Sequence, residues 1–141
     1  MRGVLVDASA LIALLDRDDA AHERTVEAVK GVRSPLSTVW PAVTEAMHLL
    51  ADAPHGVDTL CDMVTDEALV LIDLEAADIA RIKALMQKYR DLPMDFADAA
   101  LVRAAEREQI THIVTLDRHF QVYRLPHRAK FVLLPQPALR R

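Results

Sequence analysis

The stretch of sequence that decides the fold lies close to the N-terminus and reads Val4-Leu5-Val6-Asp7-Ala8-Ser9-Ala10-Leu11. Its three opening aliphatic residues predict a short buried strand over residues 4–6. The carboxylate of Asp7 follows directly, and more apolar residues come after it. A carboxylate in such a setting costs roughly several kcal/mol unless a cation or hydrogen-bond donors lie close by. We therefore expect Asp7 to belong to a functional site.

Length and composition indicate a helix-covered sheet in one unit. A chain of 141 residues suits one core, and residues 1–141 are expected to form a single domain. Hydrophobic residues make up 52% of the chain and aromatic residues only 4%. The single cysteine, Cys61, excludes an internal disulfide and is expected to be a small buried residue. Without a secretory signal or a run of roughly 18 apolar residues, a cytoplasmic protein is expected.

The charge is distributed unevenly along the chain. Residues 1–80 carry 5 Lys and Arg against 15 Asp and Glu, whereas residues 81–141 carry 12 against 6. After Asp117 there is no acid, but there are six basic residues: Arg118, Arg124, Arg128, Lys130, Arg140 and Arg141. This basic end could hold an anionic partner through phosphate contacts, or it could be a solvated basic tail.

Alternating strand and helix patterns predict an α/β domain around a mainly parallel sheet. Strands are expected over residues 4–6, after the turn at 34–37, over 69–72 and 113–116, and at a sheet edge over 131–134. Helices are expected over residues 10–16, from Asp18 or Asp19 to about 32, and from Pro41 to about 51. A further helix is expected after the break at residues 52–56 and ends at about residue 65. Two more are expected over 75–89 and 95–108. Residues 134–141 are expected to form a short irregular tail.

This topology predicts that several carboxylates meet at one edge of the sheet. Asp7 and Asp117 stand at or just after the ends of short apolar strands, and Asp95 and Asp98 open a helix. Ligands of open α/β sheets bind beyond the carboxyl ends of the strands, where helix N-termini also tend to lie. At least three carboxylates are therefore expected on one rim.

The position of Asp98 on its helix allows two interpretations. At about 100° per residue its nearest neighbours are apolar, namely Leu101, Val102 and Ala105. The solvated face of the same helix is expected to carry Arg103, Glu106 and Arg107. Asp95 and Asp98 could also form a capping arrangement that accepts backbone N–H groups. We expect both to hold in part, with Asp95 as a helix cap and Asp98 as a site residue.

Three further polar residues stand near these acids. Glu45 flanks the apolar stripe of its helix, which by itself indicates an ordinary boundary residue. Ser9 could cap the first helix or bond a neighbouring carboxylate. Thr115 lies on the same side of its strand as Asp117, where its hydroxyl could donate a hydrogen bond to a carboxylate. Alternatively, Thr occurs there only because β-branched residues favour strand conformation.

The expected site is rich in oxygen and lacks the ligands of a zinc site. The six histidines form no ligand pattern, and no Gly-rich phosphate loop, Ser-x-Gly elbow or Cys-x-x-Cys motif occurs. Carboxylate ligands without His or Cys favour Mg²⁺ or Mn²⁺ over Zn²⁺.

Four motifs in this order resemble the PIN domain, and most closely the VapC-like toxins of bacterial toxin–antitoxin pairs. Beside residues 4–11 they are Pro41-x-x-x-Glu45, Asp95-Phe96-Ala97-Asp98-Ala99-Ala100-Leu101-Val102 and Thr115-Leu116-Asp117-Arg118-His119-Phe120. Each motif alone is weak, but the four together span nearly the whole chain. The resemblance implies a PIN-like three-layer fold, endoribonuclease activity, inhibition by a small cognate antitoxin, and a homodimer.

The resemblance also implies roles for particular residues. It implies an acidic quartet that holds Mg²⁺ or Mn²⁺, formed by Asp7, Glu45, Asp98 and Asp117. It implies hydroxyl residues beside the first and last of these acids, Ser9 and Thr115. Some relatives carry a further acid just after the last Asp, where this chain has Arg118 and His119. A complete second metal site is therefore not implied.

The expected mechanism is metal-assisted hydrolysis of an RNA phosphodiester bond. The preferred metal ligands are Asp7, Asp98 and Asp117, directly or through water, with Glu45 binding a second ion or orienting water. Asp95, Ser9 and Thr115 would support them. The RNA backbone would contact Arg118, Arg124 and Arg128.

Two other functions fit parts of the pattern. The chain could be a catalytically weak PIN-fold module that binds RNA or protein. It could also be an Asp-based metal-dependent phosphatase, although Ser9 stands where a paired Asp would be expected two residues after Asp7.

Overall fold

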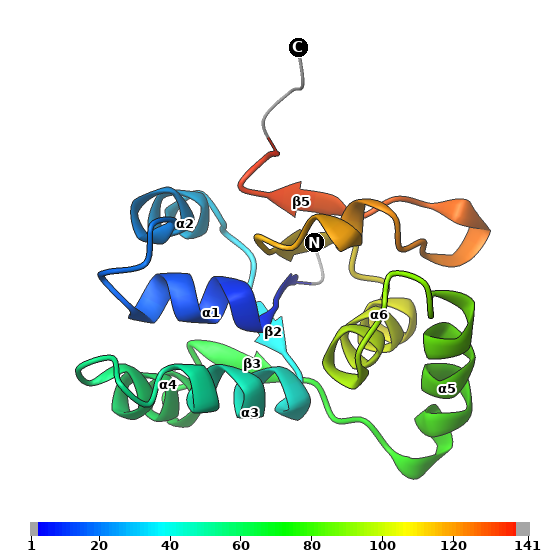
Figure 1. Cartoon of the computed structure of the whole chain (residues 1–141), viewed down its shortest axis with the longest axis horizontal. Coiled ribbons are helices and arrows are strands. Elements are labelled where there is room, and N and C mark those ends of the chain that lie inside the picture. The colour runs from blue at the N-terminus through cyan, green and yellow to red at the C-terminus, as the bar shows by residue number, and fades with distance from the viewer. Residues whose placement is uncertain (1–2, 138–141) are drawn as a thin grey trace.

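The computed structural model describes residues 3–137 and contains one five-stranded sheet (Figure 1). All four strand pairs are parallel, and the strand order is β3-β2-β1-β4-β5. The strands are β1 Val4–Val6, β2 Leu36–Thr38, β3 Leu69–Leu71, β4 His112–Val114 and β5 Val132–Leu134. The α/β class and the edge position of the last strand are confirmed, and the sheet is fully parallel.

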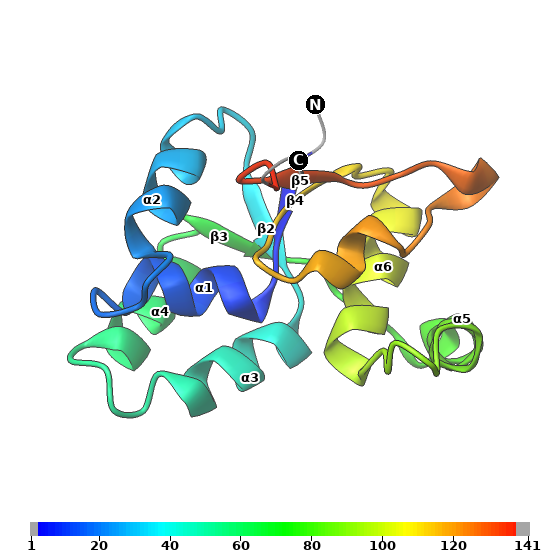
Figure 2. The ribbon, with the colours of Figure 1, turned by 45° about the horizontal axis from the view of Figure 1, so that its top comes forward.

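Helices cover both faces of the sheet, which gives three layers (Figures 1 and 2). The helices of one face are α1 Ala8–Leu15, α2 His22–Lys30, α3 Trp40–Leu49 and α4 Gly56–Thr65. Those of the other face are α5 Ile79–Lys88 and α6 Phe96–Glu108. Short 3-10 turns occur at η1 Ala76–Asp78, η2 Arg118–Gln121 and η3 Pro126–Arg128. No helix within residues 3–137 is both long and apolar enough to cross a membrane.

The core consists of two apolar clusters, one on each face of the sheet. Side chains alternate along a strand, so Val4 and Val6 join the cluster under α1, α3 and α4, while Leu5 joins the cluster under α5 and α6. Strands buried on both faces read as continuous apolar runs, as in residues 4–6. Each fully buried leucine or valine side chain stabilises the fold by about 1.5–3 kcal/mol.

The site lies where the strand order reverses. From β1 the chain proceeds to β2 and β3 on one side, and it returns to β4 and β5 on the other side. The carboxyl ends of β1 and β4 therefore stand side by side at the switch point, which is where ligands of such sheets bind. Asp7 follows β1 directly, and Asp117 follows β4 by three residues.

Several predicted element ends differ from the structure. Helix α1 begins at Ala8 and not at residue 10, because the Asp7 carboxylate already accepts a hydrogen bond from Ala10 N. Helix α2 begins only at His22, since Asp19 closes a turn by accepting a hydrogen bond from Ala21 N and does not cap the helix. Both differences come from side-chain hydrogen bonds that compete with helix geometry.

Three other expectations are corrected. Cys61 is exposed on α4, so its expected burial is wrong. Leu134 belongs to β5, residues 135–137 are irregular, and residues 138–141, with Arg140 and Arg141, lie outside the described residues. The apolar spacing within residues 75–89 predicts Ile79 on one buried face with Ile82 and Leu85, but Ile79 is 48% exposed.

An ion-pair network fastens α5 to α6. The Asp78 side chain, 4% exposed as a residue, accepts hydrogen bonds from Arg103 Nε at 2.8 Å and Arg107 Nη1 at 2.9 Å. Arg81 of α5 binds Glu106 of α6 through two nitrogens. The face of α6 that was expected to be solvated is therefore largely a contact with α5, a fact that helical periodicity alone does not reveal.

We predict that Asp78→Asn lowers the free energy of unfolding by about 2 kcal/mol, because two arginines lose a charged acceptor. The hydrogen bond from Glu75 N, followed by Arg103 and Arg107, holds the pKa of Asp78 below its ordinary value, so the carboxylate is the form that the network requires. Chemical denaturation followed by circular dichroism measures the change.

Glu108→Gln is the matched control, because its carboxylate is half exposed and contacts Arg107 only at 3.9 Å. It should change stability by less than about 0.5 kcal/mol. Equal effects of the two variants would contradict a specific role for Asp78.

Candidate metal-binding site

Asp7 is a buried carboxylate at the start of α1, and both of its oxygens are hydrogen-bonded. Oδ1 accepts from Ser9 Oγ at 2.6 Å and from Ala10 N at 3.0 Å. Oδ2 accepts a short hydrogen bond from Thr115 Oγ1. The residue is 4% exposed. Asp7 therefore caps the helix and at the same time joins the ends of β1 and β4.

Two hydroxyl groups extend this network to the segment that follows β4. Ser9 Oγ accepts a hydrogen bond from Leu116 N at 3.0 Å, and Thr115 Oγ1 accepts one from Asp117 N at 2.9 Å. Of the alternatives for Ser9, the bond to a carboxylate is the one observed. Thr115 likewise donates to Asp7 and orders the chain that leads to Asp117.

Burial raises the pKa of Asp7 from its ordinary value of 3.8 to about 6. The bonds from Ser9, Thr115 and Ala10 N act in the opposite direction, and the negative charge of Asp117 adds to the rise. The protein therefore holds a desolvated carboxylate that its own donors stabilise only in part.

Asp95 and Asp98 form the expected capping arrangement at the start of α6. Asp95 Oδ1 accepts from Asp98 N at 2.8 Å, and Asp98 Oδ2 accepts from Asp95 N at 3.4 Å. Burial, followed by the charge of Asp95 and that of Asp117, raises the pKa of Asp98 to about 7. The capping interpretation of the pair is therefore confirmed, and the role of Asp98 as a site residue stays a prediction.

Asp117 and Glu45 complete the acidic group. Asp117 begins the η2 turn, where its Oδ1 accepts from His119 N at 2.9 Å and lies 3.3 Å from His119 Nδ1. Glu45 is exposed on α3, and its pKa is raised by partial burial and then by the charges of Asp95 and Asp117. The charge of Asp117 thus acts on Asp7, Asp98 and Glu45 alike, which places Asp117 within electrostatic reach of the other three; these four carboxylates are the rim.

Among the described residues, no lysine or arginine offsets the negative charge of this rim. Within residues 3–137, no Lys or Arg forms an ion pair with Asp7, Glu45, Asp98 or Asp117. Oxygen donors with raised pKa values fit a hard divalent cation, which would favour their charged forms. In the same range, however, no three His, Cys, Asp or Glu side chains stand close enough to hold a metal ion as they are. The residues fit such an ion in chemistry and charge, but they do not form a preformed cage.

The structure adds one residue that sequence reasoning missed. Tyr123 is fully buried, and its hydroxyl donates to Asp98 Oδ2 at 3.4 Å. Burial and then the charge of Asp98 raise the pKa of this hydroxyl, so it remains a donor. No spacing rule pointed to it, because η2 reverses the chain between Asp117 and Tyr123.

The three arginines expected at the RNA backbone separate into two places. Arg118 lines a small pocket of about 90 Å³ beside Asp117, together with Arg24 of α2. Arg124 and Arg128 line a larger basic cleft between α5, α6 and the η2–η3 segment. Nothing in the sequence pointed to Arg24.

The PIN domain family matches residues 4–125. Ribonuclease VapC26 of Mycobacterium tuberculosis is 30% identical to the chain over 136 residues, which cover 94% of this chain and 100% of the relative. The chain therefore belongs to the PIN-domain family, and VapC ribonucleases are among its relatives.

Solved structures share the fold at lower identity. The sarcin–ricin-loop-cleaving toxin VapC20 of Mycobacterium tuberculosis superposes with a TM-score of 0.72 at 15% identity, covering 78% of this chain and 86% of that one. A toxin–antitoxin complex from Klebsiella pneumoniae gives 0.64 at 16% identity, with 82% and 87% covered. VapBC2 of Rickettsia felis, bound to a DNA fragment from its promoter, gives 0.63 at 11% identity, with 93% and 98% covered.

We predict that Asp7→Asn stabilises the metal-free protein well above pH 7. Asn keeps the cap and removes the desolvated charge. The pKa of Asp7 is raised to about 6 and that of Asp98 to about 7, so the folded state binds more protons than the unfolded chain. The free energy of unfolding of the wild type therefore falls as the pH rises from about 4 to about 7. The contribution of Asp7 is up to about 3 kcal/mol, and Asp7→Asn should flatten that part of the curve.

Chemical denaturation across this pH range, with EDTA present, measures the effect. Asp62→Asn on the exposed side of α4 is the control and should leave the curve unchanged. A destabilised Asp7→Asn protein with the wild-type pH slope would show that the buried carboxylate is fully compensated by its hydrogen bonds.

Proposed function

We propose that the chain is a divalent-metal-dependent endoribonuclease and the toxin of a toxin–antitoxin pair. The observation that carries this proposal is the rim of four carboxylates at the β1–β4 switch point, where no Lys or Arg of the described part pairs with them. The 30% identity to a VapC ribonuclease over nearly the whole chain supports RNA as the substrate.

The residues that would hold the ion are Asp7, Asp98 and Asp117, with Glu45 as a further ligand or as the residue that orients the attacking water. When bound, Mg²⁺ or Mn²⁺ supplies a Lewis acid that polarises the phosphoryl group and a water of lowered pKa. Because the carboxylates form no closed cage, several ligands would be water molecules, as is usual for Mg²⁺.

The protein's own groups prepare this site. The donors Ser9 and Thr115 hold Asp7 in one orientation, and Asp95 positions the backbone of Asp98. The hydroxyl of the buried Tyr123 donates to Asp98 from the inner side of the rim. Arg118 and Arg24, beside Asp117, can bind a phosphate next to the cleaved bond.

Protein partners are part of the proposal. Trp40, Ile79 and Phe96 are 56%, 48% and 44% exposed, and they line two adjoining apolar hollows of about 270 and 440 Å³. An exposed apolar patch of this kind supports a contact with another protein. We propose that the chain forms a homodimer in the cytoplasm and that a cognate antitoxin inhibits it.

One observation favours a second candidate function, a PIN-fold module that binds RNA or protein without cleaving. Within residues 3–137 no three potential ligands are ready to hold one ion. Tight RNA binding without metal-dependent cleavage would establish this alternative.

We predict that the protein cleaves RNA with Mg²⁺ or Mn²⁺ and that EDTA abolishes the activity. Asp7→Asn and Asp98→Asn should each lower the single-turnover rate by about 100-fold or more, since each removes a charge that the ion requires. Glu45→Gln should have a smaller effect, because its side chain is exposed. Cleavage of labelled total RNA, resolved by gel electrophoresis, measures these rates.

Asp62→Asn again serves as the charge-matched control and should cleave at the wild-type rate. Full activity in EDTA, or in Asp7→Asn and Asp98→Asn, would rule out the proposed chemistry.

A further inference from the structure

We propose that the basic cleft behind the carboxylate rim binds the phosphate backbone of the substrate RNA outside the cleaved bond. The cleft lies between α5, α6 and residues 122–128. This inference rests on the proposed function and adds a second, separate contact with the substrate.

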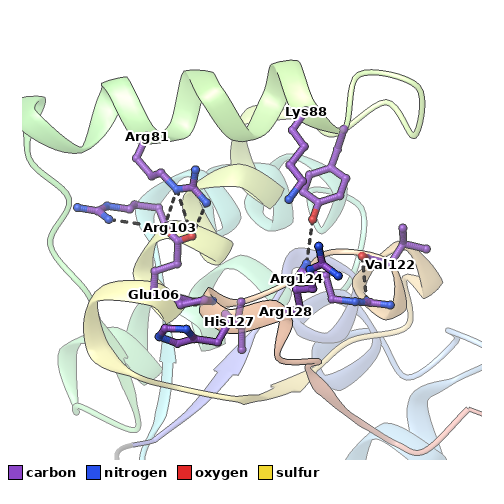
Figure 3. A pocket seen from close by; sticks show the side chains of 11 residues that line it. Arg81, Lys88, Arg103, Glu106, Val122, Arg124, His127 and Arg128 are labelled. Carbon is purple, nitrogen blue, oxygen red and sulfur yellow. Dashed lines mark hydrogen bonds and ion pairs between the residues drawn. The ribbon is translucent and has the colours of Figure 1, made fainter.

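The cleft is large enough for a stretch of nucleic-acid backbone. Its volume is about 790 Å³, and its lining is dominated by cationic side chains from both walls, namely Arg81, Lys88, Arg103, Arg124 and Arg128. Figure 3 shows Lys88 extending from α5 toward the segment that carries Arg124 and Arg128, whereas Arg81 of the same helix reaches Glu106 of α6. Glu106 is its one acidic lining residue among those that the structure describes.

Two of these cations already pair with carboxylates, and the other three do not. Arg81 and Arg103 bind the carboxylates of Glu106 and Asp78. Lys88, Arg124 and Arg128 form no ion pair with any residue in the range 3–137. Lys88 lies over the Tyr89 ring at 5.2 Å. Three positively charged residues thus line the cleft without an ion pair to a described carboxylate.

The facing wall is a short hairpin with a strained basic tip. Arg124 and Lys130 form an antiparallel bridge, and Leu125 N donates to Ala129 O at 2.8 Å. At the tip, His127 and Arg128 both have φ of 62°, a left-handed conformation that normally selects Asn and Gly in tight hairpins. Strained backbone at non-glycine residues concentrates at functional sites.

One of the three cations is also structural. Arg124 Nη1 donates to the carbonyl oxygens of Gln121 and Val122 at 2.6 and 2.9 Å, which closes the η2 turn. Lys88 and Arg128 have no such contact, so they can be replaced without disturbing a turn. They are the residues on which the proposal is tested.

A pair of tyrosines connects the cleft to the rim. Tyr89 lines the cleft, and its ring centroid lies 5.0 Å from that of Tyr123. The Tyr123 hydroxyl reaches Asp98 on the rim at 3.4 Å. The cleft and Asp98 therefore lie on either side of one packed pair of tyrosines.

Electrostatics explain why such a contact is needed. The acidic rim repels phosphate, and a bound cation offsets only part of that charge. Affinity for RNA must then come from cations outside the rim, and counterion release from the backbone is the principal source of such affinity. An acidic segment of a partner protein could bind the same cations in the cleft. RNA is favoured because the substrate has to bind at the rim, and the cleft would hold the backbone beyond it.

The test compares two double variants with the same loss of charge. Lys88→Gln with Arg128→Gln alters the cleft, whereas Lys83→Gln with Arg90→Gln alters the other side of α5, beside an apolar hollow. The probe is a labelled single-stranded oligoribonucleotide of mixed sequence, with binding measured in EDTA over a range of salt concentrations. Thermal unfolding verifies that each variant is folded.

We expect the cleft variant to bind the RNA about 10-fold more weakly at physiological ionic strength. Its log–log salt slope should fall by about 1.4, or about 0.7 for each lost phosphate contact. In cleavage assays KM should rise while kcat stays close to the wild-type value. The Lys83 and Arg90 variant should match the wild type.

Equal binding by the cleft variant and its control would overturn the proposal, as would wild-type protein that binds the RNA without salt dependence. Lost affinity for a co-expressed protein partner, with RNA binding intact, would assign the cleft to that partner instead. If wild-type protein binds RNA through the cleft but never cleaves it, the cleft proposal stands and the nuclease proposal fails.

Discussion

The structure depends on one electrostatic constraint, which is that four carboxylates share the rim at the switch point of the sheet and that no Lys or Arg among residues 3–137 pairs with them. Two of them carry most of the cost: the pKa of the buried Asp7 carboxylate is raised to about 6 despite three hydrogen bonds, and the pKa of Asp98 is raised to about 7. Such an arrangement lowers stability at neutral pH. The four carboxylates therefore serve a purpose other than folding stability. The chemistry of their oxygens supports binding of a divalent cation as that purpose.

The rest of the fold holds this rim in place. The parallel sheet brings the ends of β1 and β4 together, and Ser9 and Thr115 connect them through hydroxyl hydrogen bonds. Helix α6 presents Asp98, and the ion pairs of Asp78 fasten α6 to α5. The same two helices form one wall of the basic cleft, so the position of the rim and that of the cleft are set by one packing arrangement.

Sequence alone predicted the parts of the site that follow from periodicity. Asp7 and Asp117 could be placed because short apolar strands end beside them, and the Asp95–Asp98 pair because helix starts have a recognisable pattern. Glu45 lies on an exposed helix face, so only the family resemblance pointed to it. Tyr123 and Arg24 were missed, since they reach the site through a chain reversal and a separate helix. The exposure of Cys61 and the pairing of Arg103 with Asp78 depend on tertiary packing, which no local pattern encodes.

The most direct test of the metal-site account is calorimetric titration of the metal-free protein with Mn²⁺ in buffers of different ionisation enthalpy. Between pH 6 and 7, where Asp7 and Asp98 titrate, binding should release roughly one proton per ion, and affinity should rise with pH until both groups are ionised. Binding without proton release, or no binding to the folded protein at any pH in this range, would contradict the account.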